Sequence, residues 1–208
     1  MENVQKQLDQ YIEKTVSEGR RPKLLIHSCC APCSSYVIEY LSRYFDLTML
    51  FYNPNMDSVT EYEKRAGELC RLIGEMGLSG DVNPVILPFD GECFAEMAKG
   101  LEEEPERGRR CEKCYELRLR KTAEYMKKHP EEKFAAFATT LTLSPLKNAA
   151  VLNGIGERLS KEYSVPYLPT DFKKKNGYLR SIELSKQYDL YRQNYCGCKY
   201  SKRGNENE

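Results

Sequence analysis

Short apolar runs alternate with amphipathic stretches along this chain, and that alternation restricts its fold more than any other feature. The runs are rich in β-branched and aromatic residues and stop at turn-forming residues, which is typical of strands. The stretches between them repeat apolar residues at helical spacing. Because neighbouring parallel strands need a crossover helix, the pattern predicts an α/β fold: a doubly wound parallel sheet with helices on both faces.

The predicted elements follow from these patterns and from the turn and capping residues that bound them. Strands are predicted at residues 23–28, 46–52, 82–89, 134–141 and 165–172. Helices are predicted at residues 34–45, 62–76, 93–101, 111–130, 146–163 and 181–195. Ser34 or Ser35 is available as the N-cap of the first of these helices.

The length of 208 residues suits a single α/β domain. We expect four parts within residues 1–208: an N-terminal helix within 1–22, a sheet core with cysteine loops within 23–180, a C-terminal helix and C-x-C segment within 181–203, and a frayed tail at 204–208.

Charge and hydropathy bear on whether the protein binds an anionic partner or a membrane. Lys and Arg together number 32 and Asp and Glu 31, so any surface for an anionic partner has to come from local clustering. The first residues are charged and amphipathic, and no apolar run approaches the length of a membrane span. We therefore expect a cytoplasmic protein with no membrane contact.

Nine cysteines are the strongest chemical signal in the sequence. In a reducing compartment they indicate metal ligands or redox groups, and an odd number cannot pair completely. Cys30 and Cys33 form a C-x-x-C pair at the start of a predicted helix, where the helix dipole favours thiolate. Cys111 and Cys114 form a second pair, and two such pairs suit either zinc or an iron–sulfur cluster. The basic residues beside the second pair favour a cluster.

The remaining cysteines are less specific. Cys196 and Cys198 form a C-x-C segment that suits an extra metal ligand, a disulfide or an electron relay. Cys70 and Cys93 are interpreted as core residues. Residues 29–33 also lie where a nucleotide-binding sheet usually has a glycine-rich phosphate loop, and bulky thiols with a proline disfavour ATP binding there.

Basic and aromatic residues interleave from residue 173 to residue 203. Such a segment can hold phosphates and stack unpaired bases, although a solvated helix face with packed tyrosines explains the pattern equally well. His27 is interpreted as a hydrogen-bonded core histidine and His129 as structural.

Six ordered motifs resemble those of the QueH-type epoxyqueuosine reductases and span residues 24–201. They are LLIHSCCAPCS, YNPN followed by EYEKR, RCEKCYELRL, FATTLTLSPLKN, PTDFKK and LYRQNYCGCKYS. The resemblance implies a sheet of the HUP or ATP-pyrophosphatase-like type, with the ATP loop replaced by cysteines. It also implies reduction of epoxyqueuosine at the tRNA wobble position to queuosine, with a 4Fe-4S cluster and a second metal ion, expected to be iron, but with neither cobalamin nor ATP.

The resemblance also assigns residues, by matching motifs. The expected metal ligands are Cys29, Cys30, Cys111 and Cys114, with Cys33 on the second metal. How these five cysteines divide between the cluster and the second metal is left open. Cys196 and Cys198 are a possible redox pair. The expected substrate-binding residues are Tyr52, Asn53, Thr139, Thr140, Lys147 and Asp171. The expected RNA-binding residues come from the clustering of basic residues rather than from the motifs; they are Arg109, Arg110, Lys173, Lys174, Arg180 and Arg192.

The expected partners are a tRNA with epoxyqueuosine in its anticodon loop and an electron donor that the sequence does not name. No catalytic acid is assigned, and Lys147 or a tyrosine is a guess for the proton source. Two other functions remain open. One is an ATP-dependent tRNA-modifying transferase, which ATP turnover would reveal. The other is a non-catalytic zinc-stabilised RNA-binding module, which would lack the colour of an iron–sulfur cluster.

Overall fold

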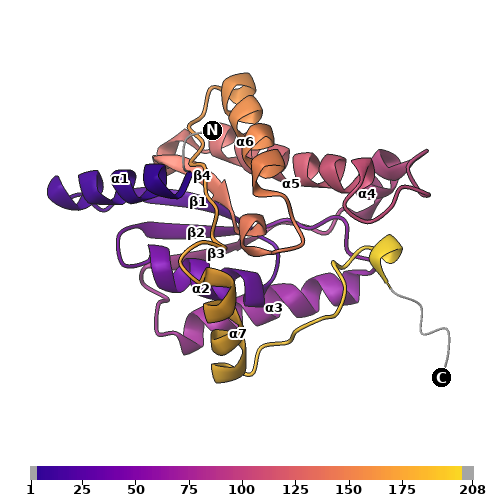
Figure 1. Ribbon diagram of the computed structural model, residues 1–208, viewed down its shortest axis with the longest axis horizontal. Helices are drawn as coiled ribbons and strands as arrows, with labels where there is room; N and C mark the ends of the chain where they lie inside the picture. Colours follow the sequence, from indigo (N-terminus) through magenta and orange to yellow (C-terminus); the bar gives the residue numbers. More distant parts are fainter. Residues whose placement is uncertain (1–3, 203–208) are drawn as a thin grey trace.

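Four strands form one parallel sheet in the computed structural model, which describes residues 4–202 (Figure 1). The strands are β1 (Lys23–Ser28), β2 (Asp46–Phe51), β3 (Val82–Ile86) and β4 (Ala136–Thr139). Their order is β3-β2-β1-β4, so the chain builds outward from β1 and then returns to its other side. This reversal opens a crevice outside the carboxyl ends of β1 and β4, the usual ligand site of such sheets.

Helices cover both faces of the sheet, which confirms the predicted α/β fold (Figure 1). One face packs against α2 (Ala31–Leu41) and α3 (Val59–Glu75), with α7 (Gly177–Gln187) outside α2. The other face packs against α5 (Arg109–Lys128) and α6 (Ala149–Tyr163). The remaining helices are α1 (Val4–Ser17), α4 (Gly91–Ala98) and the 3-10 turns η1 (Pro130–Glu132), η2 (Thr140–Leu143) and η3 (Lys199–Ser201). None of the helices within residues 4–202 has the length and apolar character needed to cross a bilayer.

Strand β1 lies in the middle of the core because it is paired on both sides and covered on both faces. Leu24 and Ile26 point to the α2 side and Leu25 to the α5 side, and all three are fully buried. A strand buried on both faces has no polar alternation, which explains the continuous apolar run in the sequence. At its carboxyl end, His27 lies in register with Thr139 of β4.

The predicted fifth strand is wrong. Residues 165–172 make only an isolated parallel bridge between Phe137 and Tyr167, with backbone hydrogen bonds to β4 from either side of it. Pro166 has no N–H to donate to β4 on one side of the bridge, and on the other side the N–H of Thr170 donates to Asn153 Oδ1, so the ladder does not extend. Pro84 similarly interrupts the hydrogen-bond donors of β3, which is an edge strand.

Helix boundaries differ from prediction by a few residues throughout, and two of these differences affect the cysteine segments. Helix α2 begins at Ala31, so its N-cap is Cys30 rather than Ser34 or Ser35, because Pro32 is well suited to the first helical turn. Helix α7 covers Gly177–Gln187 and leaves residues 188–198 without helix or strand. The expected frayed tail at 204–208 lies outside the described residues.

Gly177 gives a test of the packing between α7 and α2. A Cβ atom there would overlap the carbonyl oxygen of Phe172 and the ring of Tyr36. We expect Gly177→Ala to lower the free energy of unfolding by roughly 1–3 kcal/mol, as overpacking does. Gly154 on α6 is the matched control: nothing lies within 4 Å of its Cβ position, so Gly154→Ala should be neutral or stabilising. Denaturant unfolding of both variants measures this, and equal stabilities would contradict the packing.

Candidate metal centre

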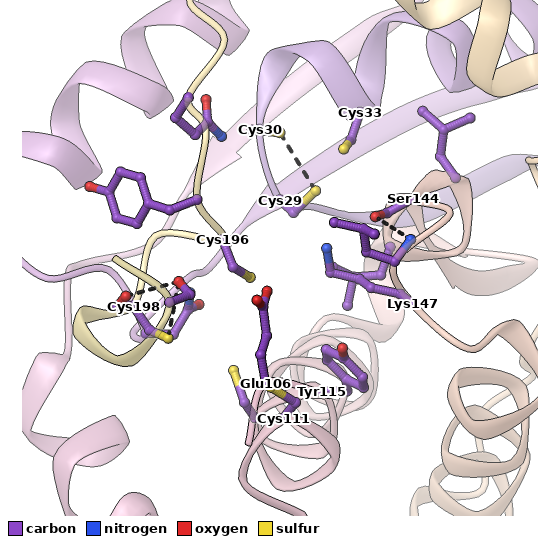
Figure 2. Close-up of a pocket in the computed structure, with 18 of the residues that line it drawn as sticks. Cys29, Cys30, Cys33, Glu106, Cys111, Tyr115, Ser144, Lys147, Cys196 and Cys198 are labelled. Carbon is purple, nitrogen blue, oxygen red and sulfur yellow. Dashed lines mark hydrogen bonds between the residues drawn. The ribbon is translucent and has the colours of Figure 1, made fainter. Parts of the chain in front are cut away.

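Seven cysteines from three parts of the chain line one pocket at the carboxyl ends of the strands (Figure 2). The pocket has a volume of about 220 Å³. Its thiols belong to Cys29, Cys30, Cys33, Cys111, Cys114, Cys196 and Cys198. The two cysteines outside it are Cys70 and Cys93. Since thiols are the preferred ligands of zinc and of iron–sulfur clusters, this pocket is the candidate metal centre.

The turn between β1 and α2 places three thiols together. The Sγ atoms of Cys29, Cys30 and Cys33 all lie within 4.8 Å of one another, and those of Cys29 and Cys30 are 3.8 Å apart. Thr140, just after β4, holds this turn: its Oγ1 accepts a hydrogen bond from Cys29 N at 3.2 Å and donates one to Cys29 Sγ at 3.4 Å. The crevice between β1 and β4 therefore determines where these thiols lie.

Hydrogen bonding couples the ionisation of the three thiols. Hydrogen bonds from Cys30 and Cys33 hold the pKa of Cys29 well below its ordinary value. Hydrogen bonding to the Cys29 thiolate in turn raises the pKa of Cys30 to about 12 and also raises that of Cys33. One proton therefore leaves readily and the next two do not. A bound metal would remove this limit because it replaces the remaining protons.

Helix α5 contributes the second pair of thiols from its first turns. Cys111 and Cys114 are three residues apart and so lie on the same helix face, toward the pocket. Cys111 Sγ accepts a hydrogen bond from Arg107 N at 3.3 Å, and burial raises the pKa of Cys114 to about 12. The last two thiols come from the C-x-C segment, where Cys198 Sγ donates to Ser201 Oγ at 3.5 Å.

Arg118 and Lys147 place positive charge beside the thiols. Arg118 is 2% exposed, its Nη2 atom has no hydrogen-bond partner, and no carboxylate in residues 4–202 forms an ion pair with it. Burial alone would lower the pKa of Arg118, but the charges of Cys114, Cys196 and Cys29 outweigh it and the pKa is raised. The same thiols, Cys196 and Cys29, raise the pKa of Lys147 against its burial.

A buried cation without a carboxylate needs another anion nearby. Metal-bound thiolates supply one, and an unpaired N–H is also suited to the sulfur atoms of a cluster, whose potential depends on such hydrogen bonds. The donor set and its charges therefore fit a thiolate-bound metal centre.

Most of the predicted substrate-binding residues do not line the pocket. Lys147 alone of the six lines the pocket. Asn53 donates to Ser28 O at 2.9 Å and accepts from Arg118 Nη1 at 3.4 Å, so it supports the thiol turn. Thr139 contacts His27 at 3.0 Å. Tyr52 is buried with its hydroxyl 3.5 Å from Asp90, and Asp171 pairs with Lys173 at 2.8 Å.

The predicted RNA-binding cations differ in their availability. Arg110 is buried and donates to the carbonyl oxygens of residues 101, 102 and 104. Arg109 pairs with Glu104, and Arg180 with Glu39 and Glu183. Arg192 lines the pocket and is exposed, with a 3.5 Å contact to Ser185, and Lys174 is exposed.

Many residues that line the pocket were not assigned any function from the sequence, and four of them lie beside the thiols or the cations: Arg65, Glu106, Tyr115 and Ser144. Figure 2 shows the Glu106 carboxylate pointing into the space between the cysteines. Two of the four could have been found. Tyr115 directly follows Cys114, and Arg65 lies one helical turn beyond Glu61 in the EYEKR motif.

The interpretation of Cys70 as a core residue is wrong, because Cys70 is exposed. The buried stripe of α3 includes Leu69, Leu72 and Ile73, and Cys70 lies about 100° around the helix from Leu69. His27 is buried and hydrogen-bonded to Thr139 and to Tyr52 O, as predicted.

Comparison with known proteins decides the family. Residues 24–204 match the family model described as "Epoxyqueuosine reductase QueH". The chain belongs to the QueH family. It is 42% identical over 201 residues to the epoxyqueuosine reductase QueH of Streptococcus pyogenes serotype M1, covering 96% of this chain and 78% of the relative. The QueH protein of Staphylococcus epidermidis is 40% identical, with coverages of 97% and 87%. That of Thermotoga maritima is 33% identical, with coverages of 86% and 89%. Membership makes this chain an oxidoreductase.

The exposed position of Cys70 can be tested on the same helix as a buried neighbour. We expect Cys70→Ser to change the free energy of unfolding by less than about 0.5 kcal/mol, as surface substitutions do. Leu69 is fully buried, so Leu69→Ala should cost roughly 2–5 kcal/mol. Chemical denaturation of the two variants compares them. A cost for Cys70→Ser similar to that of Leu69→Ala would show that Cys70 packs in the core.

Proposed function

We propose that this protein reduces the epoxide of epoxyqueuosine at the wobble position of a tRNA, giving queuosine. The observation that carries the proposal is the pocket of seven cysteines with Arg118 and Lys147 beside them, in a chain of the QueH family. A 4Fe-4S cluster on Cys29, Cys30, Cys111 and Cys114 fits the thiol set, with Cys33 on a second metal ion, iron. Neither cobalamin nor ATP is part of the proposal.

The proposed reaction removes the epoxide oxygen and leaves an alkene, so it consumes two electrons and two protons and releases water. Bound metals would pass on the two electrons, one at a time, from the external electron donor and would offer a Lewis acid for the oxygen. The part left to the chain is to hold the substrate and to donate protons. Lys147 and Tyr115 line the pocket, and the pKa of each is raised, that of Tyr115 by burial to about 12. Both side chains therefore stay protonated at neutral pH and can donate hydrogen bonds to the oxygen.

The pocket volume of about 220 Å³ is smaller than the roughly 300–1,000 Å³ of pockets that enclose a drug-sized ligand. We infer that only the epoxide-bearing end of the nucleoside enters. The rest of the RNA would lie across the mouth, where Arg107 and Arg192 are exposed beside the pocket. An anticodon loop suits this arrangement because its bases are already unpaired. The proposal also includes a separate electron donor and a redox role for Cys196 and Cys198.

The metal content of cysteine variants tests the ligand assignment. We expect Cys111→Ser and Cys114→Ser each to lose most of the iron and inorganic sulfide of the anaerobically purified protein, because each removes one thiolate of four. Cys70→Ser and Cys93→Ser are matched controls outside the pocket and should retain both. Elemental analysis with visible absorption measures this. Full iron in the Cys111 and Cys114 variants, or zinc in place of iron in the unaltered protein, would overturn the assignment.

The salt dependence of RNA binding tests the proposed mouth. We expect Arg192→Gln to weaken binding of the anticodon stem-loop and to reduce the slope of log affinity on log salt by roughly 0.7–0.9, the value of one phosphate contact. Lys161→Gln is the control. This substitution also removes one positive charge, but at the last turn of α6. Because α6 runs back from the carboxyl end of β4, its last turn lies at the opposite end of the sheet from the pocket. Equal slopes for the two variants would contradict this binding surface.

A further inference from the structure

The segment that carries the C-x-C cysteines has no secondary structure of its own. Residues 188–198, here called the strap, run from α7 along α3 to η3 (Figure 1). Side chains of α3 hold the beginning of the strap. Arg71 Nη2 donates to Tyr188 O at 3.0 Å and to Asp189 O at 3.2 Å. Glu68 Oε1 accepts from Tyr191 N at 2.7 Å.

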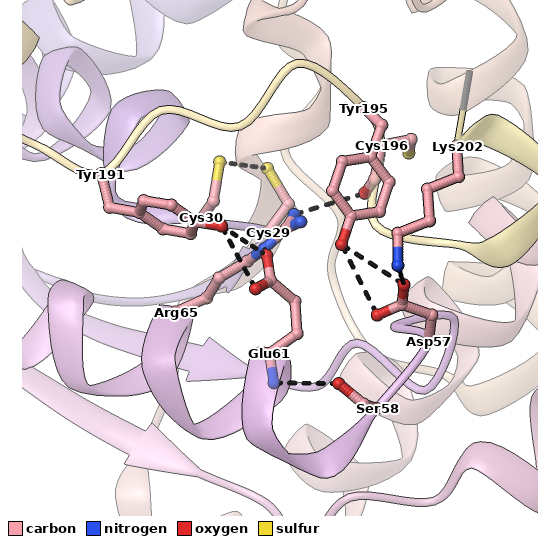
Figure 3. A network of polar contacts seen from close by, with 10 residues as sticks. All are labelled: Cys29, Cys30, Asp57, Ser58, Glu61, Arg65, Tyr191, Tyr195, Cys196 and Lys202. Carbon is pink, nitrogen blue, oxygen red and sulfur yellow. Dashed lines mark hydrogen bonds and ion pairs between the residues drawn. The ribbon is translucent and has the colours of Figure 1, made fainter. Parts of the chain in front are cut away.

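Two residues near the start of α3 hold the end of the strap (Figure 3). Asp57 N donates to Gly197 O at 2.9 Å, and the Asp57 carboxylate accepts from Tyr195 Oη at 3.4 Å and pairs with Lys202 at 2.7 Å. Glu61 accepts from Tyr191 Oη at 3.2 Å. The EYEKR motif and the YCGC motif, far apart in the sequence, therefore form one polar contact.

Arg65 is the central residue of that contact. Its side chain is 2% exposed, and its Nε donates to Glu61 Oε1 at 2.6 Å. Its Nη1 donates to Cys196 O at 3.4 Å, and its guanidinium carbon lies 5.3 Å from the centre of the Tyr195 ring. Arg65 also lines the thiol pocket, where its Nη2 has no hydrogen-bond partner among the described residues.

Gly197 fits against this guanidinium. Its φ is +111°, a conformation that side chains rarely adopt, and a Cβ atom there would lie 3.1 Å from Arg65 Nη1. Glycine therefore satisfies two requirements at the centre of the C-x-C segment: the backbone turn and the close approach of Arg65. A planar guanidinium can bind a carboxylate, accept an aromatic ring on its face and donate to a carbonyl at once, which a lysine ammonium cannot do.

We propose that Arg65, oriented by Glu61, is a positioning residue that fixes Cys196 and Cys198 at the thiol pocket. Residues 188–198 have no ladder or helix to restrain them, so their position depends on such side-chain contacts. This inference extends the proposed function. It rests on that function only for the statement that the C-x-C thiols take part in the reaction.

The test measures how fast Cys196 and Cys198 react with iodoacetamide in the reduced, folded protein, by mass spectrometry of peptides. Alkylation rises with thiol exposure and with the fraction of thiolate, and because loss of the Arg65 charge does not favour thiolate, acceleration reports exposure. In Arg65→Gln we expect it to be faster by roughly 5- to 30-fold, the range for losing one or two kcal/mol of restraint. Arg65→Lys should remain close to Arg65→Gln, because a lysine does not restore the planar contacts.

Two further variants keep the test decisive. Gly197→Ala disturbs the same contact from the strap side without changing α3, so it should also accelerate alkylation if Arg65→Gln proves unstable. Arg71→Gln is the matched control: it removes an arginine of α3 that holds the other end of the strap, and it should leave Cys196 labelling within about twofold of the unaltered protein. Unchanged labelling in both Arg65→Gln and Gly197→Ala, or equal acceleration in Arg71→Gln, would overturn the inference.

Failure of the proposed function would look different. Cys196→Ser and Cys198→Ser report on epoxide reduction, whereas alkylation reports only on the position of the strap. Full epoxide reduction by both serine variants would remove the redox role of the pair, and accelerated alkylation in Arg65→Gln would still establish that Arg65 fixes its position.

Discussion

Strand β1 is hydrogen-bonded on both sides, to β2 and to β4, and the residues that follow it must leave the sheet at the point where the strand order reverses. Everything in the pocket depends on that constraint. Thr140 follows β4 and binds Cys29, which follows β1, so strand pairing itself brings the threonine to the first thiol. The turn then leads directly into α2, whose first turn contains Cys33. Helix α5 and the strap bring their thiols to a place that β1 and β4 have already fixed.

Electrostatics then limits what the pocket can hold. Ionisation of one turn thiol makes the next two harder to ionise, while Arg118 and Lys147 supply positive charge and neither forms an ion pair with a carboxylate within residues 4–202. The residues are therefore better matched to a centre in which all ligating thiols are deprotonated than to free thiols.

The sequence was sufficient for the strands that form the sheet, because continuous apolar runs such as residues 23–28 have few alternatives in a chain of this length. It also predicted that the paired cysteines would share one site. It failed where the outcome depends on neighbours distant in the chain. Pro166 and the side chain of Asn153 end a ladder that composition alone suggested, and Cys70 has apolar neighbours on its helix but faces solvent. Arg65 and Arg118 are cations in the sequence, and only the packed structure shows that they are buried at the thiols.

Both edges of the sheet deny hydrogen-bond donors to an approaching strand. Pro84 removes one N–H from β3, and at the other edge the bridge at Tyr167, flanked by prolines, covers β4. Unprotected edges are where sheets of separate molecules join and aggregate. The prolines at both edges therefore work against intermolecular β-pairing, so copies of this protein can be concentrated with less risk of joining sheet to sheet.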